Sequence, residues 1–124
     1  MIIHGREIHF LLTVGATRKI SRLCPDNDVQ NIGLIFEAKD TEKIIDTIAE
    51  LSAAMSEGYE SQQKYLHPGY EPNPLTKDEV YTLTIQELTD LQDELMGEIG
   101  NSMKVSVEAE PEKSGKLKKK EATK

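Results

Sequence analysis

The sequence predicts an α+β domain that is mainly α, in which a short N-terminal β-hairpin packs on about four helices. Two observations predict this fold. Apolar and polar side chains alternate around a glycine in the first twelve residues, and later stretches space their aliphatic side chains by three or four positions. A chain of 124 residues suits one domain, which we expect over 1–104, followed by a tail over 105–124.

The hairpin is expected over residues 1–12, with its turn at His4-Gly5 or Gly5-Arg6. Either turn places the same apolar side chains on one face of the ribbon, namely Met1, Ile3, Ile8, Phe10 and Leu12. A two-stranded ribbon is only marginally stable alone, so we expect helices to cover this face.

Two short helices are predicted next. Thr13 is the expected N-cap of the first, over about 13–24, which Pro25 ends. Its apolar side consists of Ala16, Ile20 and Leu23. Asp28 is the expected N-cap of the second helix, over 29–37, whose apolar residues are Val29, Ile32, Ile35 and Phe36.

A third helix is predicted over 41–57, with Asp40 or Thr41 at its start and Gly58 after its end. Its aliphatic residues recur at spacings of four, three and four, which is the pattern of an amphipathic helix: Ile44, Ile48, Leu51 and Met55. We expect this face to pack into the core.

The main loop is predicted over 59–75, which contains three of the five prolines and three of the four tyrosines. His67 precedes Pro68, and a residue before proline disfavours the helical backbone conformation. The loop could be a rigid aromatic contact surface, because prolines lower the entropic cost of ordering a bound segment, or it could be a spacer. Its candidate contact residues are Tyr65 and Tyr70.

The last helical stretch is predicted over 76–104, with a break near 82–84. Capping-box patterns begin its two parts, Thr76 with Glu79 and Thr84 with Glu87. Its apolar stripe supplies further candidate partner-binding residues: Leu88, Leu91, Leu95, Ile99 and Met103. The opposite face is acidic, with Glu87, Asp90, Asp93, Glu94 and Glu98. The stripe can either complete the chain's own core or dock a partner helix, and the sequence leaves both open.

Charge divides the chain into two parts. The whole chain carries a formal net charge of −7. Residues 105–124 contain six lysines and four glutamates, so this tail carries +2 and residues 1–104 carry −9. Because the tail has few apolar side chains to offset the entropic cost of ordering, we expect it to be disordered.

The composition favours binding over catalysis. The lone Cys24 excludes an internal disulfide, and its place beside an apolar helix face predicts core packing. The three histidines, His4, His9 and His67, are dispersed, so we expect no metal site and no cofactor. The sequence has no glycine-rich phosphate loop and no nucleophile motif, and its acids lie on helix faces. We therefore predict that the protein is not an enzyme.

Charge and hydropathy also bear on partners and compartment. An acidic surface disfavours the phosphate backbone, which predicts no nucleic-acid partner. The first ten residues do not resemble a signal peptide, and no apolar stretch is long enough to cross a membrane. We expect a cytoplasmic protein that does not contact membranes.

The order of features along residues 1–104 is distinctive. A very short hairpin is followed by Thr13-Val14-Gly15-Ala16 at the start of a helix and Leu23-Cys24-Pro25-Asp26 at its end. Then come a short helix, a long aliphatic helix with Leu51-Ser52-Ala53-Ala54-Met55, and an acidic leucine-rich helix. This order resembles that of the small tail assembly chaperones of long-tailed, siphovirus-like bacteriophages and related prophages.

The resemblance implies a non-virion assembly factor in the bacterial host cytoplasm that binds the tape measure protein and helps recruit tail tube protein subunits. An acidic chaperone with an apolar stripe could keep the apolar faces of a tape measure chain soluble until the tube polymerises around it. Self-association is a further expectation. Many members of this family also make a longer form by ribosomal frameshifting. Lys118-Lys119-Lys120 lies where slippery codons could occur, although a solubilising tail would look the same.

Two other classes of protein remain open. The first is a structural component of the virion, such as a tail-completion or head-tail connector protein. The second is an acidic inhibitor that mimics DNA, suggested by the charge of −9 over residues 1–104.

Overall fold

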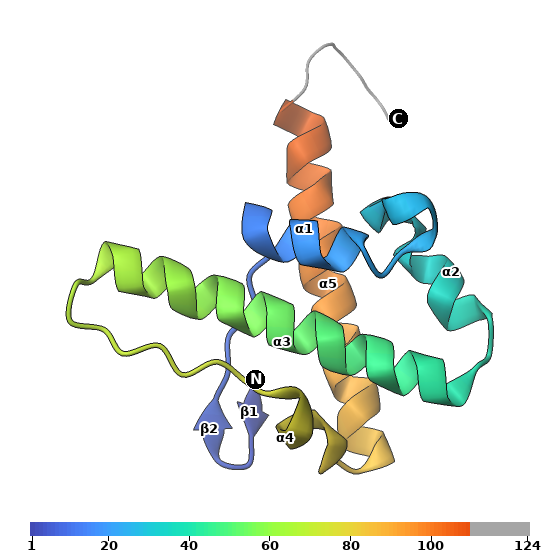
Figure 1. Cartoon of the computed structure of the whole chain (residues 1–124), viewed down its shortest axis with the longest axis horizontal. Coiled ribbons are helices and arrows are strands. Elements are labelled where there is room, and N and C mark those ends of the chain that lie inside the picture. Colours follow the sequence, from blue (N-terminus) through green and yellow to red (C-terminus); the bar gives the residue numbers. More distant parts are fainter. Residues whose placement is uncertain (110–124) are drawn as a thin grey trace.

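The structure is a computed structural model that describes the backbone of residues 1–109 and the side chains of residues 1–103. It confirms the predicted fold class: a two-stranded hairpin packs with a mainly helical domain (Figure 1). Two long helices, α3 (Thr41–Leu66) and α5 (Ile85–Ala109), cross one another, and α1 (Val14–Ser21) packs on α3.

The hairpin is shorter than predicted. Strands β1 (Ile2–Ile3) and β2 (Arg6–Glu7) are antiparallel, and His4 and Gly5 form the turn, with φ angles of 51° and 79°. Positive φ at both positions is typical of the type I′ hairpin turn. The predicted ribbon over 1–12 was wrong beyond residue 8, because the following segment leaves the ribbon and crosses α3. There the amide of Leu11 donates a hydrogen bond to the carbonyl of Met55, at 3.1 Å.

Helix α1 begins as predicted, with the Thr13 hydroxyl accepting a hydrogen bond from the Ala16 amide at 3.1 Å. It ends at Ser21 rather than at residue 24. Two 3-10 turns follow, η1 (Pro25–Asn27) and η2 (Val29–Asn31), before α2 (Ile32–Glu37). Asp28 is a cap as predicted, but it caps η2, where its carboxylate accepts a hydrogen bond from the Gln30 amide at 3.0 Å.

Helix α3 starts after Asp40, one of the two starts left open by the sequence, and the Asp40 carboxylate accepts a hydrogen bond from the Lys43 amide. The predicted end near residue 57 was wrong, because the helix continues to Leu66 and ends only before Pro68. Gly58 lies inside the helix, and its missing side chain leaves room for the segment that crosses there. A glycine in a helix costs about 1 kcal/mol relative to alanine, which this close packing can offset.

The last two helices follow the predicted pattern. Helix α4 (Lys77–Tyr81) and helix α5 are separated by residues 82–84, as expected. Both capping boxes form: Thr76 and Glu79 exchange hydrogen bonds with each other's backbone amides, and so do Thr84 and Glu87. Helix α5 continues to Ala109, beyond the predicted end of the helix at residue 104. The rest of the predicted disordered tail, 110–124, lies outside the described residues.

One aliphatic core joins the elements. Its most deeply buried large side chains come from four helices and the loop before α4: Ile20, Ile48, Leu51, Met55, Leu75, Val80, Leu91 and Leu95. Cys24 is buried as predicted, and its thiol donates to the Ile20 carbonyl at 3.3 Å. In the part of the chain that the structure describes, no helix is both long enough and apolar enough to span a membrane.

Candidate partner-contact surface

The apolar stripe of α5 contributes to the chain's own core. Leu91, Leu95 and Ile99 are buried, while Leu88 and Met103 are half-buried against the core. Of the two roles that the sequence left open, packing is the one that the structure assigns to this stripe. A partner could reach the three buried side chains only if α5 separated from α3, so a partner role for them stays a prediction.

The other predicted contact residues lie on a projection, which we call the arm and define as residues 59–74. It consists of the last two turns of α3 and the extended segment that folds back along them (Figure 1). All of its side chains are half-buried or exposed, whereas the preceding Gly58 is buried. The sequence suggested a loop here, but half of the arm is helix.

Polar contacts fix the returning segment of the arm against α3. The carboxylate of Glu60 accepts hydrogen bonds from the Tyr70 hydroxyl at 2.7 Å and from the Asn73 amide at 3.0 Å. The buried Ser56 hydroxyl accepts a hydrogen bond from the Leu75 amide at 2.8 Å. These contacts close the arm at its base, so that its conformation is set before any partner binds.

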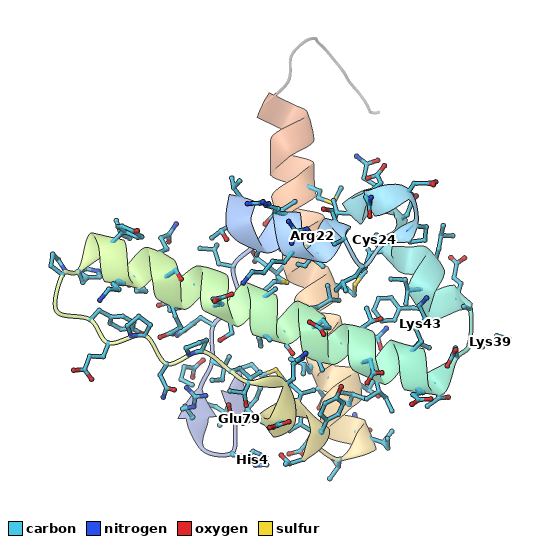
Figure 2. All side chains as sticks on the ribbon, viewed as in Figure 1. His4, Arg22, Cys24, Lys39, Lys43 and Glu79 are labelled. Carbon is cyan, nitrogen blue, oxygen red and sulfur yellow. The ribbon has the colours of Figure 1, made fainter. Side chains whose placement is uncertain are left out.

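The hairpin adds a second support to the base of the arm. The guanidinium of Arg6 donates to the Asn73 carbonyl at 2.6 Å and forms an ion pair with Glu79 at 3.3 Å. The backbone amide and hydroxyl of Thr76, together with the Arg6 guanidinium, lower the pKa of the Glu79 carboxyl below its ordinary value. Glu79 therefore joins the capping box of α4 to the hairpin (Figure 2).

The two predicted tyrosines have different roles on the arm. Tyr65, on the last turn of α3, is 89% exposed, as a contact residue should be. Tyr70 is half-buried, and its hydrogen bond to the Glu60 carboxylate raises the pKa of its phenol. Tyr65 is therefore available for contact, whereas Tyr70 holds the arm together.

The end of the arm presents an apolar surface that the sequence only partly predicts. Leu66, which follows Tyr65, is 61% exposed. A shallow hollow of about 630 Å³ lies beside Tyr65 and is lined by Ser61, Lys64, Tyr65 and Pro68. We call Tyr65, Leu66 and Pro68 the arm tip. The sequence contains a signal for the exposure of Leu66. No proline or glycine occurs between residues 58 and 68, so the helix can continue past the last residues that it buries in the core.

The outer face of α5 is acidic, as predicted. Four of its five expected acids are exposed: Glu87, Asp90, Asp93 and Glu94. Glu98 differs, because it is half-buried and its carboxylate accepts hydrogen bonds from the Leu12 amide at 3.4 Å and the Ser102 hydroxyl at 3.0 Å. No lysine or arginine occurs between residues 85 and 103, so this face has a strongly negative potential.

The histidines and the cysteine make local contacts. The His4 ring lies 2.7 Å from the Thr82 hydroxyl, and the His9 ring stacks at a tilt on Tyr59, with centroids 4.7 Å apart. Burial raises the pKa of the Cys24 thiol. Among the described residues, no group of three or more His, Cys, Asp and Glu side chains is arranged to hold a metal ion.

Comparison of the chain with protein-family models, with curated proteins and with solved structures finds no match.

Proposed function

We propose that the protein is a tail assembly chaperone of a long-tailed bacteriophage, which binds an apolar helical segment of the tape measure protein and helps recruit tail tube subunits. One observation carries the proposal: the consecutive residues Tyr65 and Leu66 are both exposed at the end of a supported arm. Large apolar side chains gathered at an exposed site are typical of protein contact surfaces.

The support of the arm favours binding at its tip. Glu60 and Ser56 fix the returning segment, so little conformational entropy remains to be lost when a partner binds. Tyrosine supplies a large contact area with only two side-chain torsions to order. The arm tip is small, so each contact is weak, which suits a chaperone that must release its client when the tube polymerises.

The charge of the domain supports the same role. Residues 1–104 carry −9, and the outer face of α5 contributes exposed acids without any basic residue. Chaperone molecules bound along a tape measure chain would repel one another and keep the complex dispersed. We place this activity in the cytoplasm of the bacterial host, and we propose that the protein acts without catalysis and is absent from the finished virion.

Co-purification with the tape measure protein of the same phage tests the proposal. We expect the double variant Tyr65→Ser, Leu66→Ser to lose the tape measure protein while keeping the helical circular dichroism of the wild type. Val14→Ser is the matched control, because Val14 is an 88% exposed apolar residue outside the arm. Wild-type yields of the tape measure protein with the double variant would refute binding by the arm tip.

The acidic face of α5 favours a second candidate, an inhibitor that mimics DNA. Glu87, Asp90, Asp93 and Glu94 are exposed along about two turns of helix. This candidate requires tight, salt-sensitive binding to a DNA-binding enzyme, and Asp90→Asn with Asp93→Asn should weaken it. A connector role is tested by mass spectrometry of purified virions, because a connector is present in the particle and a chaperone is absent.

A further inference from the structure

A groove runs along α3 beside the C-terminal end of α1. It consists of two adjoining hollows of about 340 and 230 Å³, which share Leu23 and Glu50 as lining residues. We call it the α3 groove. The other lining residues of the first hollow are Asp40, Glu42, Lys43, Asp46 and Thr47. Those of the second are Lys19, Ala53, Ala54, Glu57, Pro74 and Leu75.

The groove combines an apolar floor with an acidic rim. Ala53 and Ala54 have small side chains, so the hollow above them has room for one large aliphatic side chain, with Leu23 and Leu75 beside it. Five acids line the two hollows against two lysines. Lys77 of α4 also forms an ion pair with Glu50 at 2.9 Å, so five acids face three lysines and the net charge is −2. Figure 2 shows one of the lysines, Lys43, near the start of α3.

Thr47 is a polar residue at the floor of the first hollow. It is 6% exposed and is one of the lining residues. A polar group bound in this hollow would therefore lie close to a threonine side chain.

The chain itself contains a segment with the complementary chemistry. Residues 113–120 read KSGKLKKK, with five lysines, no acid and one large apolar residue, Leu117. Leu117 lies eight positions beyond Ala109, a distance that an extended chain can span up to about 28 Å. In the view of Figure 1, helix α5 extends beyond α1 on the side away from the hairpin, and the described part of the chain ends there.

We propose that the α3 groove is the docking site of the chain's own C-terminal segment, with Leu117 over Ala53 and Ala54 and the neighbouring lysines on the acidic rim. Opposite charges attract at this rim, and Leu117 provides the single apolar anchor. The acidic face of α5 is the competing site for the lysines, and the experiment below distinguishes the two sites. This inference does not depend on the proposed chaperone function.

Paramagnetic relaxation in the full chain tests the docking. A nitroxide label is attached at Thr123→Cys in a Cys24→Ala background, and the amide signals of the domain are recorded by NMR. We expect the signals of Glu50, Ala53 and Ala54 to lose most of their intensity and to recover it in high salt, where the charges are screened. Loss at Asp90 and Asp93 instead, or no loss anywhere, would overturn the proposal.

Two variants and a mixing experiment sharpen the test. Ala53→Arg fills the hollow with a basic side chain, so the amide signals of the residues around the groove should recover their intensity. Ser61→Arg, at an exposed position of the same helix, is the control and should leave the signals weak. Leu117→Ser should also restore them, and Leu117→Met should not. In the mixing experiment, one set of chains carries the nitroxide without ¹⁵N, and the other carries ¹⁵N without the nitroxide. We expect the amide signals of the second set to keep their intensity. Loss in the mixture would show that a second copy, and not the same chain, fills the groove.

Discussion

Gly58 of α3 lies so close to Thr13 that a Cβ atom at position 58 would be 2.8 Å from the Thr13 hydroxyl oxygen. The same atom would lie 2.9 Å from the carbonyl oxygen of Leu11. Leu11 in turn donates its amide hydrogen to the Met55 carbonyl, one turn earlier in α3. The segment before α1 is therefore held against α3 at a point where only glycine fits.

We expect Gly58→Ala to destabilise the fold, by about 1–3 kcal/mol, because the new methyl group overlaps a backbone oxygen that cannot move without breaking the Leu11 bond. Urea unfolding followed by circular dichroism measures the change. Gly97→Ala is the control, since a Cβ there meets nothing within 4 Å. That variant should be unchanged or more stable by up to about 1 kcal/mol. Equal stability of both variants would contradict the close approach.

The apolar stripe of α5 gives a second prediction. Leu95 is fully buried, so Leu95→Ala should cost about 2–5 kcal/mol of unfolding free energy through lost burial and the cavity left behind. Ile85 precedes it in the same helix but is 73% exposed, and Ile85→Ala should change the stability by less than about 0.5 kcal/mol. Thermal unfolding of the two variants measures both changes in stability. If the stripe were an open docking face, the two changes would be small and similar.

Local chemistry made much of the fold predictable. The caps at Thr13, Asp40, Thr76 and Thr84 act within three residues of themselves. The sequence identified three of them and left Asp40 and Thr41 as alternatives for the fourth. Periodicity likewise identified the buried face of α5. It could not say what covers that face, because a stripe that fills a core and one that docks a partner have the same spacing.

The features that sequence analysis missed depend on distant parts of the chain. Gly58 looked like a helix end, and only the crossing segment at Leu11 to Thr13 explains why the helix tolerates it. The arm was read as a loop, because its support comes from Glu60 contacting an amide thirteen residues later. The α3 groove combines residues from three separate stretches, so no local pattern marks it.

Acid should weaken the contact between the hairpin and α4. The pKa of Glu79 is lower in the folded chain than its ordinary value of 4.5, so its ionised form stabilises the fold. This contribution is complete above about pH 4.5 and is lost as the pH falls through the folded pKa. Glutamine keeps the capping box but does not titrate, so Glu79→Gln should lose less stability than the wild type between neutral pH and pH of about 3.

Urea midpoints measured across that pH range test this expectation, with Glu71→Gln as the control. Glu71 is an exposed residue of the arm, so its replacement should leave the pH profile of the wild type unchanged. Identical profiles for all three proteins would show that the lowered pKa of Glu79 contributes nothing to folding.

The arm should open when Glu60 is removed. Glu60→Ala deletes the acceptor for both the Tyr70 hydroxyl and the Asn73 amide, and we expect the Asn73 amide to exchange its hydrogen with solvent faster. Tyr70→Phe removes only the first bond, so it should accelerate this exchange less. Because the carboxylate holds the phenol proton, the pKa of Tyr70 should also fall toward its ordinary value of 10 in Glu60→Ala, which an NMR titration of the ring signals measures. Unchanged exchange at Asn73 would mean that Arg6 and Ser56 alone support the arm, and the arm tip would then keep its shape without Glu60.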